Sequence, residues 1–312
     1  MTSDQYHLLE QDIKDISWGN ADSDWTPPQT LPDLSQYDTI SIDLETKDEN
    51  LTKLGPGWCR KDGHIIGIAV GAGDSAWYFP IAHTVGNMPR KVVMKWLGDI
   101  CKDTTKTVVF HNALYDLGWL RAEGVEVKGK IRDTMVVAPL LDENRRYYNL
   151  NSLARDHLKT YKDEKLLKSA AEEFGVDPKS GMWRLPPRYV GAYAEQDALI
   201  TLRLWNELEK KIVSEECTGI FNLETKLTPI LLDMKTKGVR VDLDKAQKVK
   251  KDLTKLEKTL LDEITKDTGV AMEPWVATSV AKVFDAVGLS YSRTEKSGSP
   301  LRIIIIQLRK KL

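Results

Sequence analysis

Short apolar runs, each about the length of a strand, recur through the first half of the chain. Their lengths predict buried strands at residues 39–44, 64–71, 76–81 and 107–110, with a further short strand at 125–127. Gly73 and Asp74 lie between the second and third of these runs, so we expect a hairpin there.

Longer segments carry apolar residues at helical spacing. The apolar positions of residues 91–101, for example, fall on one face of a helix. The same criterion predicts helices at residues 115–123, 133–142, 151–157 and 188–216. Strands followed by helices interleaved with a further strand predict an α/β fold, in which a mixed sheet is flanked by helices.

The two ends of the chain differ from this central part. Residues 1–36 form a polar leader in which prolines interrupt regular structure. After Cys217, a helix at 221–237 stops at Gly238, and a second helix, capped by Asp242 or Asp244, runs to about residue 266. The apolar positions of that second helix are spaced by three and four residues, which is typical of a helical hairpin or coiled coil: Ala246, Val249, Leu253, Leu256 and Leu260. We therefore divide the chain into residues 1–36, 37–216 and 217–312.

Composition adds few constraints. Apolar residues make up 41% and charged residues 29% of the chain, as in soluble globular proteins. We expect a cytoplasmic protein without a membrane anchor, because no apolar stretch approaches the roughly 18 residues of a span, no secretory signal begins the chain, and the three cysteines are widely spaced.

The net charge of -1 provides no global basic field, so binding to nucleic acid needs local basic patches. One candidate patch lies between residues 145 and 168, where tyrosines interleave with Arg145, Arg146, Arg155, Lys159, Lys162, Lys165 and Lys168. A second consists of Arg302, Arg309, Lys310 and Lys311. Each patch taken alone is typical of a solvated helix face.

Two acidic residues end the first apolar run. Asp43 and Glu45 are two apart in a strand, so both carboxylates point to the same side of the sheet. Burying unpaired carboxylates costs free energy. A divalent cation such as Mg²⁺, which takes oxygen ligands, would compensate for that cost. Triplets of this kind are also common where a strand end frays into solvent, so the pair alone identifies no site.

Two further acidic residues are placed on helices. Asp116 lies one turn after Asn112, which is also suited to cap the start of that helix. Tyr193 and Asp197 are four residues apart and share a helix face, although an exposed aspartate beside a core tyrosine gives the same pattern. The order, spacing and structural context of the three acidic segments agree, and together they point to two-metal phosphodiester hydrolysis.

These segments resemble the DnaQ-like 3′–5′ exonucleases of the DEDD type, and in detail the proofreading domain of family A (bacterial DNA polymerase I-like) DNA polymerases. The matching motifs are IDLET with Asp43 and Glu45, HNALYD with Asp116, and YAEQD with Tyr193 and Asp197. Tyr193 is typical of the tyrosine subgroup, DEDDy. The resemblance spans about residues 37–215 and implies an RNase H-like fold, followed here by a helical hairpin.

The resemblance implies a metal-dependent 3′–5′ exonuclease that releases nucleoside 5′-monophosphates from single-stranded or frayed DNA 3′ ends. Two divalent ions, Mg²⁺ or Mn²⁺, are expected to be held by Asp43, Glu45, Asp116 and Asp197. Tyr193 is expected to orient the attacking water. The expected substrate contacts, which include stacking of the terminal base, are Leu44, Thr46, Asn112 and Trp183.

The segment LTPILLDMKTKGVRVDLDKA is similar to the start of a polymerase thumb, and this similarity ends near Pro300. No palm or fingers sequence follows, so we expect no polymerase activity and interpret the chain as a partial, phage-like polymerase. Its C-terminal helices then pair with each other, self-associate or bind a separate polymerase subunit. The isoleucine run at residues 303–306 is either a strand that adds to another sheet or an aggregation hazard.

Two other functions stay open. One is an RNA 3′ exonuclease of the RNase D-like type, against which the thumb-like segment argues. The other is a non-catalytic module that binds nucleic acid or a polymerase, against which the intact acidic positions argue.

Overall fold

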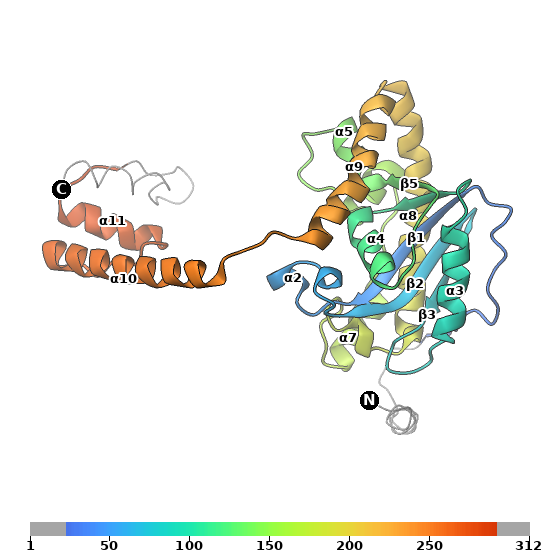
Figure 1. Cartoon of the computed structure of the whole chain (residues 1–312), viewed down its shortest axis with the longest axis horizontal. Helices are drawn as coiled ribbons and strands as arrows, with labels where there is room; N and C mark the ends of the chain where they lie inside the picture. The colour runs from blue at the N-terminus through green and yellow to red at the C-terminus, as the bar shows by residue number, and fades with distance from the viewer. Residues whose placement is uncertain (1–22, 292–312) are drawn as a thin grey trace. The chain divides into compact units, whose positions relative to one another are not determined.

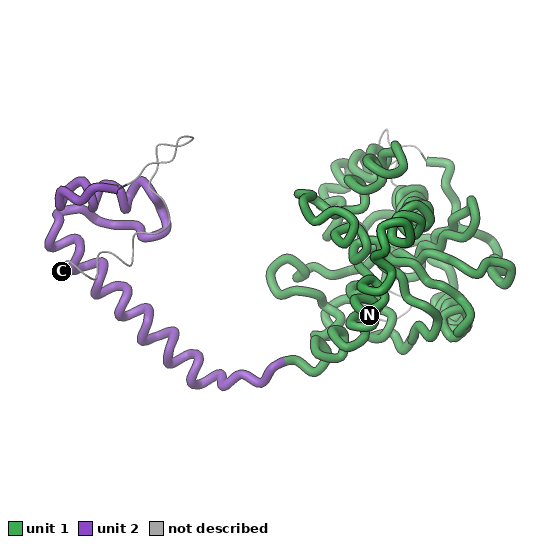
Figure 2. Tube along the Cα trace, turned by 90° about the horizontal axis from the view of Figure 1, so that it is seen from above, with its two compact units in different colours: residues 1–238 green, residues 239–312 purple. Residues whose placement is uncertain are grey.

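The structure is a computed structural model that describes residues 23–291. The chain divides into two compact units, residues 1–238 and residues 239–312 (Figure 2). The predicted strands and their flanking helices all belong to the first unit.

The first unit is built on a five-stranded sheet with the strand order β3-β2-β1-β4-β5 (Figure 1). Its strands are β1 (Thr39–Lys47), β2 (His64–Ala72), β3 (Ser75–Pro80), β4 (Thr107–Phe110) and β5 (Lys130–Asp133). The pairs β1–β2 and β2–β3 are antiparallel, whereas β1–β4 and β4–β5 are parallel. The mixed sheet and the hairpin at Gly73 are thus confirmed.

The strand expected at residues 125–127 is wrong, because the fifth strand begins only at Lys130. Val125 instead donates its backbone N–H to the carbonyl of Leu120 at 2.8 Å, which closes the end of the preceding helix. Its side chain is buried in the core. The apolar residues at 125–127 therefore belong to a loop that packs on the core, and they form no strand.

Helices cover both faces of the sheet (Figure 1). One core contains side chains of α3 (Arg90–Cys101) and α4 (Ala113–Ala122). Two clusters on the other face contain residues of α5 (Thr134–Leu141), α7 (Lys165–Glu173) and the long helix α8 (Gly191–Ser214). The helix α7 was not predicted from the sequence. The shorter elements of this unit are α2 (Leu51–Leu54), η1 (Gly57–Cys59), α6 (Leu150–Leu153), η2 (Ala154–Leu158), η3 (Met182–Arg184) and η4 (Pro187–Tyr189).

The alternation of β1 decides which side chains meet α8. Ile40, Ile42 and Leu44 are buried in the core that holds α3 and α4. Ser41 points the opposite way, and its hydroxyl donates to the carbonyl oxygen of Ala198 in α8 at 2.6 Å. Because side chains two apart share a face, Asp43 and Glu45 lie on the α8 side of the sheet.

A β-bulge lies beside these acidic residues. Glu45 pairs with Gly67 and Thr46 pairs with Ile65, which leaves Ile66 of β2 as the extra residue. Bulges bend a strand and often occur next to active sites, where they re-aim a side chain. Here the irregularity separates the acidic positions of β1 from the end of the strand at Thr46 and Lys47.

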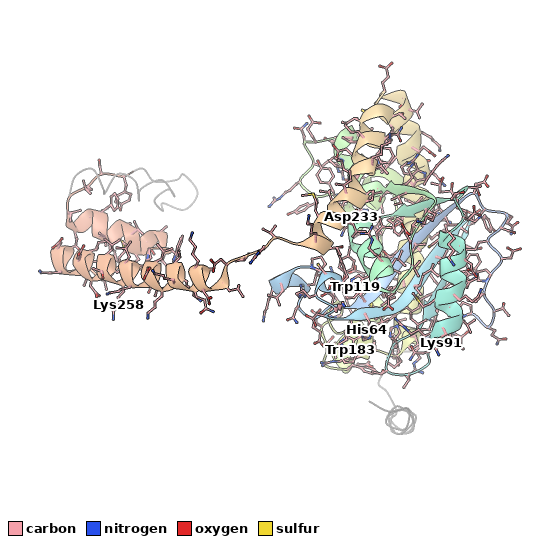
Figure 3. All side chains as sticks on the ribbon, viewed as in Figure 1. His64, Lys91, Trp119, Trp183, Asp233 and Lys258 are labelled. Carbon is pink, nitrogen blue, oxygen red and sulfur yellow. The ribbon has the colours of Figure 1, made fainter. Side chains whose placement is uncertain are left out.

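The first unit extends beyond the 37–216 division made from the sequence. The helix α9 (Thr218–Lys237) packs on it: Leu232 lies in the core, and Asp233, which is labelled in Figure 3, pairs with Arg121 of α4 at 2.5 Å. At the other end, Trp25 donates its indole N–H to Glu195 of α8 at 3.0 Å. The described part of the leader, residues 23–36, contains no helix or strand, as expected, but it packs against the domain.

The second unit contains α10 (Leu243–Thr268) and α11 (Ala277–Ala286), which contact each other. Asp242 caps α10 by accepting the backbone N–H of Lys245 at 2.9 Å, so this cap is confirmed. Within the unit the side chains of α10 project into solvent (Figure 3), including the predicted apolar stripe, with Val249, Leu253, Leu256 and Leu260 all exposed. The isoleucine run and the second basic patch lie outside the described residues.

No helix within residues 23–291 combines the length and the apolar character needed to cross a bilayer.

Replacing Gly71 with alanine tests the close approach of α8 to the sheet. An added Cβ would lie 2.5 Å from Ser41 Oγ and 3.1 Å from the carbonyl oxygen of Ala198, so one of them must move. We expect the free energy of unfolding to fall by about 1–3 kcal/mol, as in other overpacked cores. The measurement is denaturant unfolding.

Gly98 in α3 provides the matched control. An added Cβ there comes no closer than 4.0 Å to the side chain of Val125, and alanine in a helix interior is expected to raise stability by up to about 1 kcal/mol. Equal unfolding midpoints for the Gly71→Ala and Gly98→Ala variants would contradict this view of the α8 contact.

Candidate active site

Carboxylates from three elements converge beside β1. Asp43 and Glu45 come from β1, and Asp197 comes from the buried face of α8. Asp116, in the first turn of α4, accepts the backbone N–H of Leu44 at 3.1 Å, which fixes it beside the same stretch of β1. The structure therefore brings together the four acidic residues expected from the sequence.

The position of Asp116 depends on Asp133, which the sequence analysis did not single out. The buried carboxylate of Asp133 accepts the backbone N–H groups of Asn112 at 2.9 Å and Ala113 at 2.7 Å, and that of Met135 at 2.8 Å. It thus joins the first turn of α4 to the first turn of α5. The cap expected from the Asn112 side chain is wrong: Asn112 has φ 75° and makes no side-chain cap bond, because Asp133 takes that role.

Asp197 forms an ion pair inside the site. The ammonium group of Lys162 lies 2.5 Å from Asp197 Oδ2, and the two side chains are only 9% and 7% exposed. The same ammonium group donates to the hydroxyl of Tyr193 at 3.1 Å. Tyr193 and Asp197 therefore share a helix face, as expected, and Lys162 connects them.

Burial and mutual repulsion shape the acidity of the four carboxylates. Burial, together with the charge of Asp197, raises the pKa of Asp43 to about 7. Burial, followed by the charges of Asp43 and Asp197, raises the pKa of Glu45 well above its ordinary value. Burial and then the charge of Asp43 do the same for Asp116, although the Leu44 N–H partly opposes this. Burial raises the pKa of Asp197 as well, and Lys162 counteracts it.

This donor set fits a divalent cation. It consists of oxygens alone, which are the ligands that Mg²⁺ and Mn²⁺ prefer. Among the described residues, Asp197 Oδ1 is buried and has no hydrogen-bond partner, a costly arrangement that a cation would relieve. With the side chains placed as they are in residues 23–291, no three His, Cys, Asp or Glu side chains lie close enough together to hold a metal ion.

The four residues expected to contact substrate lie in different surroundings. The expected contact of the Leu44 side chain is contradicted, because this side chain is 6% exposed and lies in the core on the other face. The Thr46 hydroxyl is 2.7 Å from the hydroxyl of Tyr115. Asn112 is exposed at the start of α4. Trp183 in η3 is partly buried, and the ammonium group of Lys47 lies 3.9 Å from its ring centroid.

The basic patch between residues 145 and 168 is not one solvated helix face. Asp156 pairs with Arg145 at 2.5 Å and with Arg155 at 2.8 Å, which offsets part of the positive charge. Lys162 lies in a segment without helix and is buried against Asp197. No spacing rule identified Lys162 in the sequence, because its partner is 35 residues further along the chain.

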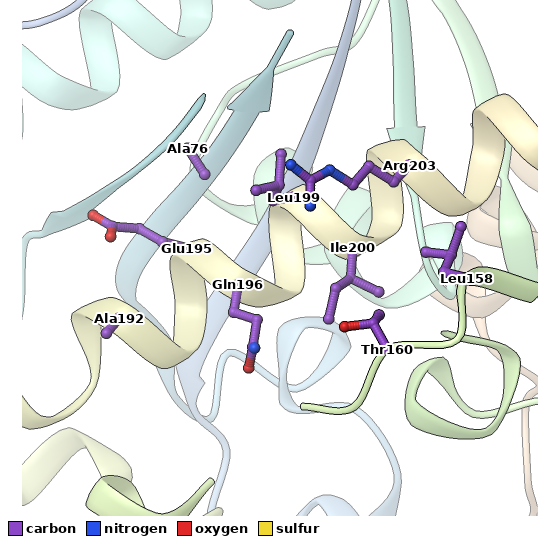
Figure 4. Close-up of a pocket in the computed structure, with 9 residues that line it drawn as sticks. All are labelled: Ala76, Leu158, Thr160, Ala192, Glu195, Gln196, Leu199, Ile200 and Arg203. Atoms are coloured by element: carbon purple, nitrogen blue, oxygen red, sulfur yellow. The ribbon is translucent and has the colours of Figure 1, made fainter. Parts of the chain in front are cut away.

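A hollow of about 440 Å³ lies against α8 (Figure 4). Its helical lining consists of Ala192, Glu195, Gln196, Leu199, Ile200 and Arg203, and none of the four acidic residues lines it. The acidic cluster is therefore separate from this hollow.

Comparison with known proteins agrees with the fold and identifies the family of this chain. A family model described as 3′–5′ exonuclease, the one of DNA polymerase A, matches residues 26–213. A DNA-directed DNA polymerase of Pseudomonas phage M6 is 34% identical over 288 residues, which cover 89% of this chain and 43% of the phage protein.

Solved structures show the same fold. The POL domain of Pol1 from M. smegmatis, in complex with DNA primer-template and dNTP, superimposes with a TM-score of 0.62 at 15% identity, covering 88% of this chain and 42% of that one. Brucella melitensis NrnC gives a TM-score of 0.50 at 19% identity, covering 67% of this chain and 91% of NrnC.

The family match defines the class of protein, a 3′–5′ exonuclease domain. The chain belongs to the 3′–5′ exonuclease family of family A DNA polymerases. It spans less than half the length of the phage polymerase that it matches.

The pKa of Asp43 predicts a pH-dependent difference between the wild type and the Asp43→Asn variant in EDTA. The pKa of Asp43 rises from 3.8 to about 7 on folding. Between these pH values the unfolded state therefore binds fewer protons than the native state, so the free energy of unfolding of the wild type falls as the pH rises. Asparagine cannot ionise, so the variant should gain stability relative to the wild type across this window.

The expected gain is at most about 4 kcal/mol, and less where solvent screens the carboxylate. Urea unfolding in EDTA at several pH values measures it. A difference in stability that stays constant from about pH 4 to pH 8 would show that the pKa of Asp43 is not raised by folding.

Proposed function

We propose that the acidic cluster is the active site of a two-metal 3′–5′ exonuclease that removes nucleoside 5′-monophosphates from DNA 3′ ends. The observation that carries this proposal is the convergence of four carboxylates from β1, α4 and α8, three of which interact with the ammonium group of Lys162. Four such groups in one partly buried place have a common use as ligands of divalent cations.

In this proposal, Asp43, Glu45 and Asp197 would hold one ion, and Asp43 and Asp116 would hold the second. Bound there, divalent ions would supply a more acidic water and positive charge for the attacking and leaving oxygens. Mg²⁺ and Mn²⁺ both suit the oxygen donors.

Tyr193 orients the attacking water. Burial, followed by the charges of Glu45 and Asp197, raises the pKa of Tyr193 far above its ordinary value. Its hydroxyl therefore stays protonated and acts through hydrogen bonds. This role requires geometry more than acidity.

The 3′ end of the substrate lies between the ends of β1 and η3. Trp183 offers a ring for stacking of a terminal base, and Lys47 places a positive charge on that ring for the adjoining phosphate. Thr46 and Asn112 border the same acidic residues of β1 and α4 and are the further contacts in this proposal.

Cleavage of a 5′-labelled primer with Mg²⁺ or Mn²⁺ tests the proposed chemistry. We expect a ladder that shortens from the 3′ end and disappears with EDTA. Asp43→Ala removes a ligand of both ions, so its rate is expected to fall on the order of 10²–10³-fold or more, as for groups that stabilise a transition state. Tyr193→Phe is the conservative companion and is expected to lose activity while keeping its fold.

Lys91 on α3 supplies a control, because Lys91→Ala changes an exposed residue on a different helix and is expected to leave the rate unchanged. A 5′-labelled RNA of the same sequence tests the RNase D-like alternative, and added nucleotides test the expectation that no primer extension occurs. Absence of cleavage of either polymer with both metals would contradict the proposal and favour a binding module.

A further inference from the structure

Among the residues that the structure describes, Lys162 is the only basic residue at ion-pair distance from the acidic cluster. Its ammonium group contacts Asp197 Oδ2 and the Tyr193 hydroxyl, and it lies 4.6 Å from the centre of the Tyr193 ring. Its charge also acts on Asp43, on Glu45 and on His111 of the neighbouring loop. One positive charge therefore faces several carboxylates from different elements.

This ammonium group binds the same carboxylate, that of Asp197, that a metal ion would bind. A divalent cation on Asp197 needs the carboxylate oxygens, and Lys162 engages one of them while the other is buried without a partner in the described structure. An ammonium group and a divalent cation repel each other when they share a carboxylate at such short range. Both cannot keep their best positions.

The chain around Lys162 allows the side chain to leave while its backbone stays. Asp163, the next residue, donates its backbone N–H to Gln196 Oε1 at 2.8 Å and so fixes the segment to α8. Residues 160–164 form no helix or strand. The four-carbon stem of a lysine then carries the ammonium group between alternative partners without a shift of the backbone.

We propose that Lys162 is an internal counter-ion of the metal-free site, which keeps the acidic cluster compact and is displaced from Asp197 when a divalent ion binds. This inference rests on the proposed two-metal function. It makes Lys162 a positioning residue that sets the metal concentration at which the site fills.

The test measures Mn²⁺ binding to the full chain without nucleic acid, by calorimetry or by loss of the free-ion paramagnetic resonance signal. Lys162→Met keeps the aliphatic stem and removes the charge. We expect it to bind Mn²⁺ roughly tenfold more tightly than the wild type, the scale on which neighbours of a metal site change its affinity. Lys165→Met, at an exposed lysine three residues away, is the control and should bind as the wild type does.

Thermal unfolding provides an independent measurement. In EDTA the Lys162→Met variant should melt below the wild type, because it leaves a buried carboxylate unpaired. Saturating Mn²⁺ should then raise its melting temperature more than that of the wild type, since a ligand that binds the native state more tightly stabilises it more. If methionine prevents folding, Lys162→Gln, which keeps a donor for Asp197, takes its place.

The outcomes separate this inference from the proposed function. Equal Mn²⁺ affinities for the wild type and the Lys162 variant would overturn the counter-ion role, while binding that Asp43→Asn abolishes would still support the metal site. A Lys162 variant with weaker affinity would also overturn it, because Lys162 would then support metal binding. If neither protein binds Mn²⁺, the two-metal proposal and this inference both fail.

Discussion

The burial of several like charges in one place is the constraint on which the rest of this structure depends. Asp43, Glu45, Asp116 and Asp197 each have a pKa raised by burial, and three of them are raised further by another aspartate of the cluster. Such a group of carboxylates opposes folding unless a cation compensates for it. The surrounding fold is built to hold these groups together in spite of that cost.

Three local features provide this support. Ser41 and Gly71 allow α8 to approach the sheet, so that Asp197 reaches the face that carries Asp43. Asp133 fixes the start of α4 and with it Asp116. The bulge at Ile66 changes the pairing of β1 immediately after Glu45. Each feature places an acidic residue by way of backbone geometry, and none contributes a ligand.

The sequence was sufficient for those parts of the site that follow from local periodicity. Asp43 and Glu45 share a face because strands repeat every two residues, and Tyr193 and Asp197 share one because helices repeat every 3.6. Long-range partners have no such signature: Lys162 and Asp133 act through contacts with residues 35 and about 20 positions away. The apolar residues near Val125 resemble a strand in sequence because both a strand and a buried loop require apolar side chains.

The C-terminal unit carries an exposed apolar surface. The apolar stripe of α10 is exposed within the described residues, whereas α9, which the sequence analysis grouped with it, packs on the exonuclease unit. An exposed apolar stripe of this kind is typical of a surface that contacts another molecule. The family model matches residues 26–213, which lie within the first unit.

The most direct test of the central claim is a crystal structure of the full chain grown with Mn²⁺, with the ions located by their anomalous scattering. The account predicts two peaks about 4 Å apart, bounded by Asp43, Glu45, Asp116 and Asp197. A single peak away from these residues, or none at a Mn²⁺ concentration that supports cleavage, would contradict it.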